Sequence, residues 1–441
     1  MSGWKIWTAT VLIGGLLAFP AAAAQELSEL KTKAEQGDAG AQLSLGKMHA
    51  KGKGAPRDFA LAAQWFRQAA GQGNAEAQTR LGNLYYNGQG VSQNTGEASL
   101  WFSKAAKQGH AQAQTYLGSM HAAGKGLPRD MAKAIEFFRQ AAEQGHAGAQ
   151  TQLGSILAKG KEVPQDYEAA AKWYRKAAEQ GNPHAQNNLG ALYEDGRGVA
   201  QNYEAAVKWY RKAAGQGHAR AQINLGVIYE KGSGLPLDMV EAVRWYRKAA
   251  EQGHAEAQLY LGDIYAAGQG VPRDYAESLN WIHKAAEQGN VDAQAALGNI
   301  YLQGMGAPQN YAAAVKWHRL AAGQGNAESQ LVLGRLYHDG ESVRQDNAEA
   351  VKWYQKAAEQ GNFEAQFILG DMYLKGDGVP QVYVQAHKWL NLASGLGKGD
   401  HRKKATQGRD ALEKRMTREE IAEAQRLAND WFIRHAKRKK K

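Results

Sequence analysis

The sequence contains no cysteine among its 441 residues. Disulfide scaffolds, cysteine zinc sites, thiol nucleophiles and lipid attachment through cysteine are therefore excluded. The absence of cysteine does not determine the cellular compartment, because a protein without disulfides can also occur in an oxidising compartment. Long apolar runs are scarce too, and beyond the N-terminal region no segment is apolar enough to span a bilayer. Hydrophobic residues at 44% and charged residues at 22% are ordinary for a folded protein, which excludes wholesale disorder.

The first 24 residues have the features of a secretory signal peptide. Lys5 is followed by the mostly apolar residues 6–19, and Ala22-Ala23-Ala24 precedes the polar Gln25. An uncleaved anchor is the alternative, but the apolar run of about 14 residues is shorter than the roughly 20 that a spanning helix needs. We therefore expect export, cleavage near Ala24-Gln25, and a periplasmic or secreted mature protein.

The rest of the chain repeats one pattern ten times. Leu-Gly pairs recur at steps of 36 residues, with their glycines at Gly46, Gly82, Gly118, Gly154, Gly190, Gly226, Gly262, Gly298, Gly334 and Gly370. A Gln-Gly series and an aromatic series from Trp65 to Trp389 keep the same step. A fixed period of this length predicts a solenoid in which each repeat contacts only its neighbours.

Each repeat predicts two helices. The first begins after Gln-Gly at an Asp, Asn or His cap, and it ends at a glycine suited to the left-handed conformation. The second begins at another Asp or Asn, a series that only Val382 breaks, and it carries the aromatic residue and paired alanines. The Leu-Gly glycine lies in the middle of the first helix, where it costs about 1 kcal/mol relative to alanine. Its presence in every copy predicts that a neighbouring backbone or ring passes too close for a side chain.

These motifs resemble a known family. Residues 185–217 read Ala-Gln-x-x-Leu-Gly-x-x-Tyr-x-x-Gly-x-Gly-Val and then Ala-x-x-Trp-Tyr-x-Lys-Ala-Ala-x-Gln-Gly. This motif is similar to that of the Sel-one-like repeat family, relatives of the tetratricopeptide repeats, and the similarity covers about residues 38–397. The resemblance implies an all-α, right-handed solenoid of helix pairs whose concave side binds proteins or peptides. It also implies a scaffold or adaptor role, in a family whose bacterial members are frequently exported. Cysteine-rich members of the family carry one disulfide per repeat, and this chain departs from them.

The predicted organisation has four parts. Residues 1–24 form the signal peptide, 25–37 an N-terminal capping half-repeat, 38–397 the ten repeats, and 398–441 a capping helix followed by a basic tail. Thr417 and Glu420 have capping-box spacing ahead of an amphipathic segment, which supports a helix that closes the end of the solenoid.

Candidate catalytic, cofactor and metal sites do not emerge from the pattern. The Gly-x-Gly loops follow no strand and are best explained as turns between helices. His110, His146, His218 and His254 recur at a cap position, and adjacent copies are too far apart to share a metal easily. We therefore expect a non-enzymatic protein without cofactor or metal. The alternative is a cell-envelope enzyme, for instance one acting on peptidoglycan, which would need a unique polar cluster in the groove.

Partner binding is predicted at positions that vary between repeats. The third, sixth, seventh, tenth and thirteenth residues after each Gln-Gly vary widely and share one side of the first helix. Their mixture of Tyr, Asn and Arg suits a protein or peptide partner, whose identity the pattern leaves open. Simple solvation of these side chains is the alternative. The predicted partner-binding residues are Arg80, Tyr116, Asn187, Asn188, Arg220, Asn224, Tyr260 and Arg335.

The formal charge of +11 is concentrated at the C-terminus. Residues 398–441 contain 15 Lys and Arg against 7 Asp and Glu, a net charge of +8, so the repeats are nearly neutral and we expect no nucleic-acid partner. The chain ends in a basic tail, Lys437, Arg438, Lys439, Lys440 and Lys441. This tail could make weak contact with an anionic membrane surface, and a disordered solubilising tail is the alternative.

Overall fold

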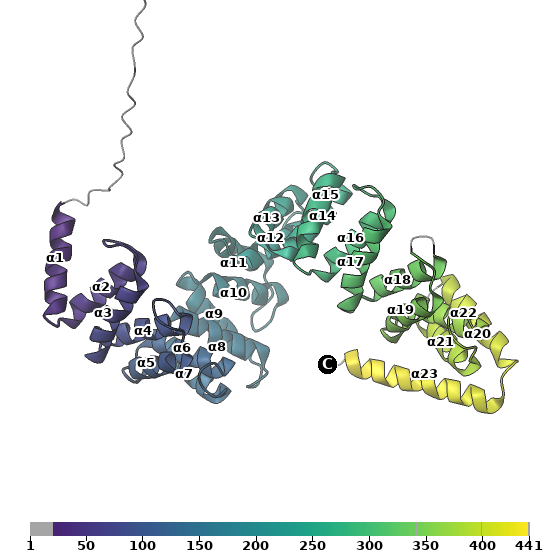
Figure 1. Ribbon diagram of the computed structural model, residues 1–441, viewed down its shortest axis with the longest axis horizontal. Helices are drawn as coiled ribbons and strands as arrows, with labels where there is room; N and C mark the ends of the chain where they lie inside the picture. Colours follow the sequence, from purple (N-terminus) through teal and green to yellow (C-terminus); the bar gives the residue numbers. More distant parts are fainter. Residues whose placement is uncertain (1–20, 341–342, 398, 440–441) are drawn as a thin grey trace, which may run out of the picture. The chain divides into compact units, whose positions relative to one another are not determined.

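The computed structural model describes residues 21–340, 343–397 and 399–439, and this part of the chain contains 23 α-helices and no strand (Figure 1). The chain divides into two compact units, Met1–Gln216 and Gly217–Lys441. Unit 1 contains α1 to α11 and unit 2 contains α12 to α23. Each unit is a series of helix pairs, so the predicted all-helical solenoid of repeats is confirmed.

Each of the ten repeats supplies a first and a second helix. The first helices are α2 (Ala39–Lys51), α4 (Ala75–Asn87), α6 (Ala111–Ala123), α8 (Ala147–Lys159), α10 (Pro183–Asp195), α12 (Ala219–Lys231), α14 (Ala255–Ala267), α16 (Val291–Gln303), α18 (Ala327–Asp339) and α20 (Phe363–Lys375). The second helices are α3 (Phe59–Gly71), α5 (Thr95–Lys107), α7 (Met131–Glu143), α9 (Tyr167–Glu179), α11 (Tyr203–Gly215), α13 (Met239–Glu251), α15 (Tyr275–Glu287), α17 (Tyr311–Gly323), α19 (Asn347–Glu359) and α21 (Tyr383–Leu396). Helix α1 (Ala21–Glu35) precedes the repeats, and α22 (Gly399–Glu413) and α23 (Arg418–Lys439) follow them.

The helix ends follow the local chemistry of the sequence. In the fifth repeat, the Asn202 side chain accepts a hydrogen bond from the Ala205 amide at the start of α11 (2.9 Å). Helix α10 ends at Gly196, whose φ of 69° is left-handed. Val382 makes no side-chain capping bond at the start of α21, as the break in the cap series predicts. The capping box is confirmed as well, because the Thr417 and Glu420 side chains each accept from the other residue's amide.

Eight of the ten mid-helix glycines make room for a ring from the second helix of the same repeat, and Gly262 and Gly370 face Ile282 and Leu390 instead. A Cβ placed on Gly190 would lie 2.8 Å from the ring of Tyr210, and one on Gly226 would lie 2.5 Å from the ring of Tyr246. These buried tyrosines immediately follow the recurring tryptophan in sequence. The tryptophan itself is half-buried in most repeats and packs between repeats, as Trp209 does against the cluster around Leu189. The close approach predicted from the glycine is confirmed.

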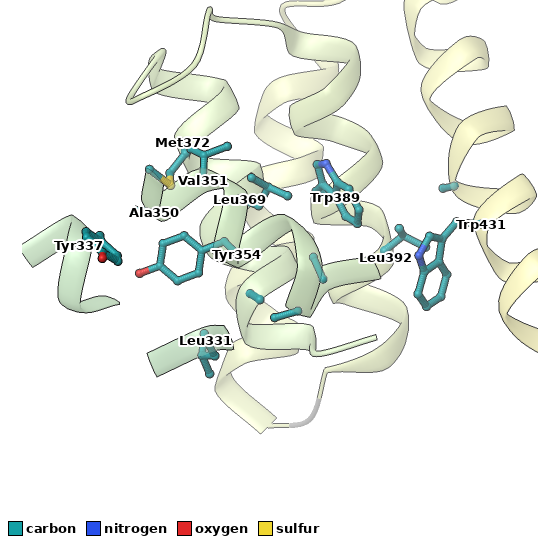
Figure 2. Packing of buried hydrophobic residues seen from close by; sticks show 14 residues of the cluster. Leu331, Tyr337, Ala350, Val351, Tyr354, Leu369, Met372, Trp389, Leu392 and Trp431 are labelled. Carbon is teal, nitrogen blue, oxygen red and sulfur yellow. The ribbon is translucent and has the colours of Figure 1, made fainter. Parts of the chain in front are cut away.

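Helix α23 contributes to the core at the end of unit 2. Figure 2 shows Trp431 of this helix beside Leu392 and Trp389 of α21, in a cluster that continues to Tyr354 of α19. Trp431 and Ala428 are buried there. Helix α23 therefore covers apolar surface that the last repeat would otherwise leave exposed.

Two glutamines per repeat tie successive helices together through buried hydrogen bonds. In unit 2, Gln258 of α14 donates to the Ala250 carbonyl of α13 (3.1 Å) and accepts from the Gln288 side chain after α15 (2.7 Å). The same side-chain pair, 30 residues apart, recurs as Gln72–Gln42, Gln108–Gln78, Gln144–Gln114, Gln180–Gln150, Gln216–Gln186, Gln252–Gln222, Gln324–Gln294 and Gln360–Gln330. Buried polar groups need such partners, so the ladder satisfies carbonyls near the ends of the second helices. It stops at Gln366, whose Oε1 is buried without a partner because Leu396 occupies the next position in the series.

The substitution Gln258→Ala is expected to lower the free energy of unfolding by about 2 kcal/mol, because it leaves the Ala250 carbonyl and the Gln288 amide without this partner. Gln258 is 4% exposed, so water cannot readily replace it. Urea unfolding followed by circular dichroism measures the change. The matched control Gln269→Ala removes a glutamine from an exposed loop position and is expected to change the free energy by less than about 0.5 kcal/mol. Equal effects of the two substitutions would contradict this role of the ladder.

Candidate interaction site

Four of the five variable positions lie on one side of the first helices. The third, seventh, tenth and thirteenth positions after each Gln-Gly are together called the first-helix face here. The residues between them are buried, as Ala221, Gln222, Leu225 and Gly226 are in α12. Ion pairs join this face from one first helix to the next in both units. Because the positions between them are packed in the core, the four positions of the first-helix face are directed away from it.

In unit 1, Arg80 is part of a three-residue ionic cluster. Its guanidinium donates to Glu76 (2.8 Å), and the same carboxylate accepts from Lys47 of the preceding first helix (2.7 Å). Partial burial favours a higher pKa for Glu76, but the hydrogen bonds from Lys47 and Arg80 outweigh it and lower that pKa. Glu76 is therefore a fixed anion that links α2 to α4.

The other predicted residues of unit 1 differ in accessibility. Tyr116 is half-buried and stacks on Phe102, with ring centroids 4.7 Å apart. Asn187 occupies the sixth position and is 7% exposed, with its amide donating to Asn188 (3.2 Å). Thr79 is buried at the same position. The sixth position thus turns toward the core, and Asn188, which is half-buried, is the member of the predicted pair that lies on the first-helix face.

In unit 2, the predicted arginines are engaged with neighbouring first helices. Arg220 pairs with Glu256 of α14 (2.5 Å), and Arg335 pairs with Glu364 of α20. Both arginines are exposed. Exposed ion pairs are worth about 0–1 kcal/mol, so a partner's carboxylate could displace Glu256 or Glu364 at little cost. Asn224 is half-buried on α12.

Buried tyrosines of the second helices reach the first-helix face with their hydroxyl groups. Tyr246 donates to Glu230 (2.5 Å), and Tyr210 makes the equivalent bond to Glu194 (2.7 Å) in unit 1. Burial first, and then the Glu230 carboxylate, raise the pKa of Tyr246 far above its usual range, so it stays a donor. Tyr260 lies beside Tyr246, with centroids 5.1 Å apart, and places an aromatic ring on the same face.

Sequence reasoning included Glu194 and Glu230 only as variable residues and missed these tyrosine–carboxylate pairs. A signal was available, because glutamate occurs at the thirteenth position only in repeats five and six, and both carry tyrosine after the tryptophan. Comparing the thirteenth position of the first helix with the residue after the tryptophan of the second helix, repeat by repeat, would have revealed the pairing.

The histidines at the cap position take part in helix capping or in contacts between helices. His146 accepts from the Ala149 amide (3.2 Å) and His218 from the Ala221 amide (3.3 Å), as caps do. His110 makes no capping bond, and its Nδ1 lies 3.0 Å from the Thr79 hydroxyl instead. Burial lowers the pKa of His110 and of His146. The Thr79–His110 and Thr115–His146 contacts link successive first helices. His254 makes no side-chain capping bond.

Four further predictions concern parts or properties outside this face. In the described part of the chain, no three or more His, Asp or Glu side chains are close enough to share a metal ion. Over the same residues, no helix is both long and apolar enough to cross a bilayer. The side chains of the basic tail, Lys437, Arg438, Lys439, Lys440 and Lys441, lie outside the described residues. Residues 1–20 of the predicted signal peptide do too, and α1 begins at Ala21.

Comparisons with known proteins agree with the repeat pattern. A model of the Sel1 repeat matches ten consecutive segments, residues 39–74, 75–110, 111–146, 147–182, 183–218, 219–254, 255–290, 291–326, 327–362 and 363–398. One similar protein of known crystal structure is a protective antigen present in uropathogenic Escherichia coli strains, which displays an SLR fold. Its sequence is 36% identical, the match covers 93% of this chain and 95% of that chain, and the TM-score is 0.57. A Sel1 repeat protein from Oxalobacter formigenes is 34% identical over 76% of this chain and 98% of that chain, with a TM-score of 0.55. No curated protein matches the chain.

Proposed function

The chain belongs to the Sel1 repeat family, and on this premise we propose that it is a non-enzymatic scaffold that binds a protein or peptide along its first-helix face in the cell envelope. Helical solenoids of such repeats are typical of protein–protein interaction scaffolds, because stacking buries one set of positions in every repeat and leaves another set free to vary. The partner's identity is open.

One observation carries the proposal: residues that differ from repeat to repeat gather on a face whose scaffold is the same in every repeat. Arg80, Asn188 and Tyr260 differ in chemistry but all occupy the seventh position after Gln-Gly, on helices that are held by shared glycines and glutamines. A rigid support with varied polar and aromatic side chains suits recognition of a particular surface.

The test begins with partner capture by the mature protein from envelope extract and continues with the affinity of the captured partner for purified variants. The double substitution Arg80→Ala/Asn188→Ala is expected to weaken binding at least about tenfold, as loss of anchoring contacts does. Helicity, measured by circular dichroism at 222 nm, is expected to stay the same, because both side chains lie at least partly on the surface.

The matched control is Lys172→Ala, which removes an exposed cation from the second helix α9 of the same unit. It is expected to leave the affinity unchanged. If Lys172→Ala weakens binding as much as Arg80→Ala/Asn188→Ala, the first-helix face is not the binding surface. Turnover of an envelope substrate that one groove substitution abolishes while binding persists would favour the enzyme alternative.

The envelope location rests on the N-terminal sequence. Cell fractionation and N-terminal sequencing of the mature protein are expected to find a periplasmic or secreted chain that begins at Gln25. A chain that retains Lys5 and sediments with membranes would indicate an uncleaved anchor instead.

A further inference from the structure

Leu237 breaks a side-chain series that the other nine repeats keep. The residue immediately before the cap of the second helix is elsewhere always arginine or glutamine: Arg57, Gln93, Arg129, Gln165, Gln201, Arg273, Gln309, Gln345 and Gln381. Several of these donate to the backbone carbonyl seven residues earlier, as Gln201 does to Glu194 (2.8 Å) and Gln309 does to Leu302 (2.9 Å). Leucine cannot donate this bond. At 63% exposure, Leu237 also gains little from burial, so the repeat loses a local stabilising contact here.

Val240 is a second exposed apolar residue, three positions further on in the first turn of α13. Repeats four and five carry Glu168 and Glu204 at the equivalent position. Val240 is 51% exposed, and Leu237 and Val240 have the largest exposed fractions of all large apolar side chains in the described part of the chain. Single exposed apolar residues are common on protein surfaces, but neighbouring ones beside a cavity indicate an interaction surface.

Such a cavity lies beside Val240. It has a volume of about 560 Å³ and extends along α13 from Val240 to Glu251, with Gly270 and Val271 of the following turn on its other side. This stretch of helix is roughly 16 Å long, so the groove has the length of a three-turn helix or a short extended segment. It lies on a second helix, away from the first-helix face.

The wall of this groove carries a small excess of positive charge, because Arg244, Arg247 and Lys248 line it together with only two carboxylates, Glu241 and Glu251. Arg247 donates to the Tyr265 hydroxyl, and the Lys248 ammonium lies 4.2 Å from the centre of the Trp245 ring. Neither cation forms an ion pair with a carboxylate of the described residues. Arg244 is paired with Glu241 (3.1 Å) at the Val240 end. Two fixed cations beside exposed apolar side chains favour a ligand that is both apolar and anionic.

We propose that Leu237, Val240 and the groove along α13 form a second docking surface, which binds an acidic amphipathic segment of a partner protein. Apolar side chains of that segment pack on Leu237, Val240 and Val271, and its carboxylates pair with Arg247 and Lys248. This surface is separate from the first-helix face and stands independently of the function proposed for that face.

The probe is a fluorescein-labelled, 14-residue amphipathic peptide that carries leucines on one side and glutamates on the other. Two further versions replace every glutamate by glutamine or by lysine. Fluorescence anisotropy with the full mature chain is expected to give the strongest binding for the glutamate peptide, at least tenfold weaker binding for the glutamine peptide, and none for the lysine peptide. Raising the salt concentration is expected to weaken the first of these interactions.

The decisive variant is Leu237→Gln/Val240→Glu, which installs the residues of repeat five. We expect at least tenfold weaker binding of the glutamate peptide. The unfolding temperature is expected to stay unchanged or to rise, because the introduced glutamine can make the bond that Gln201 makes. The control Ala276→Glu alters the position equivalent to Val240 in the next repeat and is expected to leave binding unchanged. Arg80→Ala/Asn188→Ala is expected to leave it unchanged too, which separates this surface from the first-helix face.

Three results would overturn the proposal. The first is unchanged affinity of Leu237→Gln/Val240→Glu for the glutamate peptide. The second is equal binding of the glutamate and lysine peptides, which would remove the assignment of an acidic partner. The third is no binding of any of the three peptides to the unmodified chain.

Discussion

Replacing Gly226 by alanine is expected to lower the free energy of unfolding by about 3 kcal/mol, although alanine is the better helix former. The added Cβ would lie 2.5 Å from one ring carbon of Tyr246 and 2.6 Å from another. The ring cannot move aside easily, because Tyr246 is completely buried and its hydroxyl is bound to Glu230. Close-packed interiors transmit such strain to their neighbours. Urea unfolding followed by circular dichroism measures the loss.

The matched control is Gly323→Ala, at the end of α17 in the same unit. A Cβ there meets nothing within 4 Å, and the residue does not have a positive φ. This substitution is expected to leave stability unchanged or to raise it by up to about 1 kcal/mol. Adding Tyr246→Ala to Gly226→Ala is expected to cost less than the sum of the two single substitutions, because removing the ring also removes the clash that the alanine creates. Equal effects at Gly226 and Gly323 would refute the packing explanation.

Unit 2 is expected to lose about 3 kcal/mol of stability as the pH falls from 6.5 to 4, through the protonation of His318. Repeat eight carries this histidine at the position where seven of the other nine repeats have phenylalanine or tyrosine against the mid-helix glycine. The residue is 1% exposed, its Nδ1 lies 3.2 Å from the Ser329 hydroxyl, and its Nε2 has no partner. Burial lowers the pKa of His318 to about 4.

The sign of the pH effect follows from proton binding. The unfolded chain binds a proton at His318 below a pKa of about 6.5, whereas the folded chain does so only near pH 4. Protons therefore favour the unfolded state in this window, and stability is highest above pH 6.5 and falls as the pH decreases. Each pKa unit corresponds to about 1.4 kcal/mol, which gives the magnitude.

The variant His318→Phe separates this effect from the titration of surface carboxylates. Phe66, Phe102 and Phe138 occupy the same position in the first three repeats. The decrease in unfolding free energy between pH 7 and pH 4, measured by urea titration at each pH, is expected to be about 3 kcal/mol smaller in this variant than in the unmodified chain. Identical decreases would show that His318 is not the responsible group.

Much of the fold could be predicted because ten copies act as an alignment within one chain. The helix pairs, the left-handed glycines, the weak cap at Val382 and the close approach at each mid-helix glycine all follow from residues that recur every 36 positions. The glutamine ladder was missed although both of its glutamines recur equally well. Recurrence reveals that a residue is needed, whereas its partner, 30 residues away on another helix, depends on how the helices stack.

The interaction face was less predictable, because variability alone does not distinguish a free side chain from one packed in a different way. Asn187 and Asn188 are both variable, yet one is buried and the other lies on the face. Arg220 and Arg335 resembled free anchors in the sequence, and the structure pairs them with Glu256 and Glu364 of the next first helices. Such pairs join residues of different repeats, which the pattern within a repeat does not describe.

The sequence by itself determined the repeat length, the two helices of each repeat and the family, since these depend on local propensities and on a fixed period. Tertiary structure alone decided which side chains are free, which carboxylates the buried tyrosines hold, and where a cavity opens beside Val240. The physical reason is that local preferences act over a few neighbouring residues, whereas burial and charge pairing depend on surfaces brought together from residues about 16 to 36 positions apart.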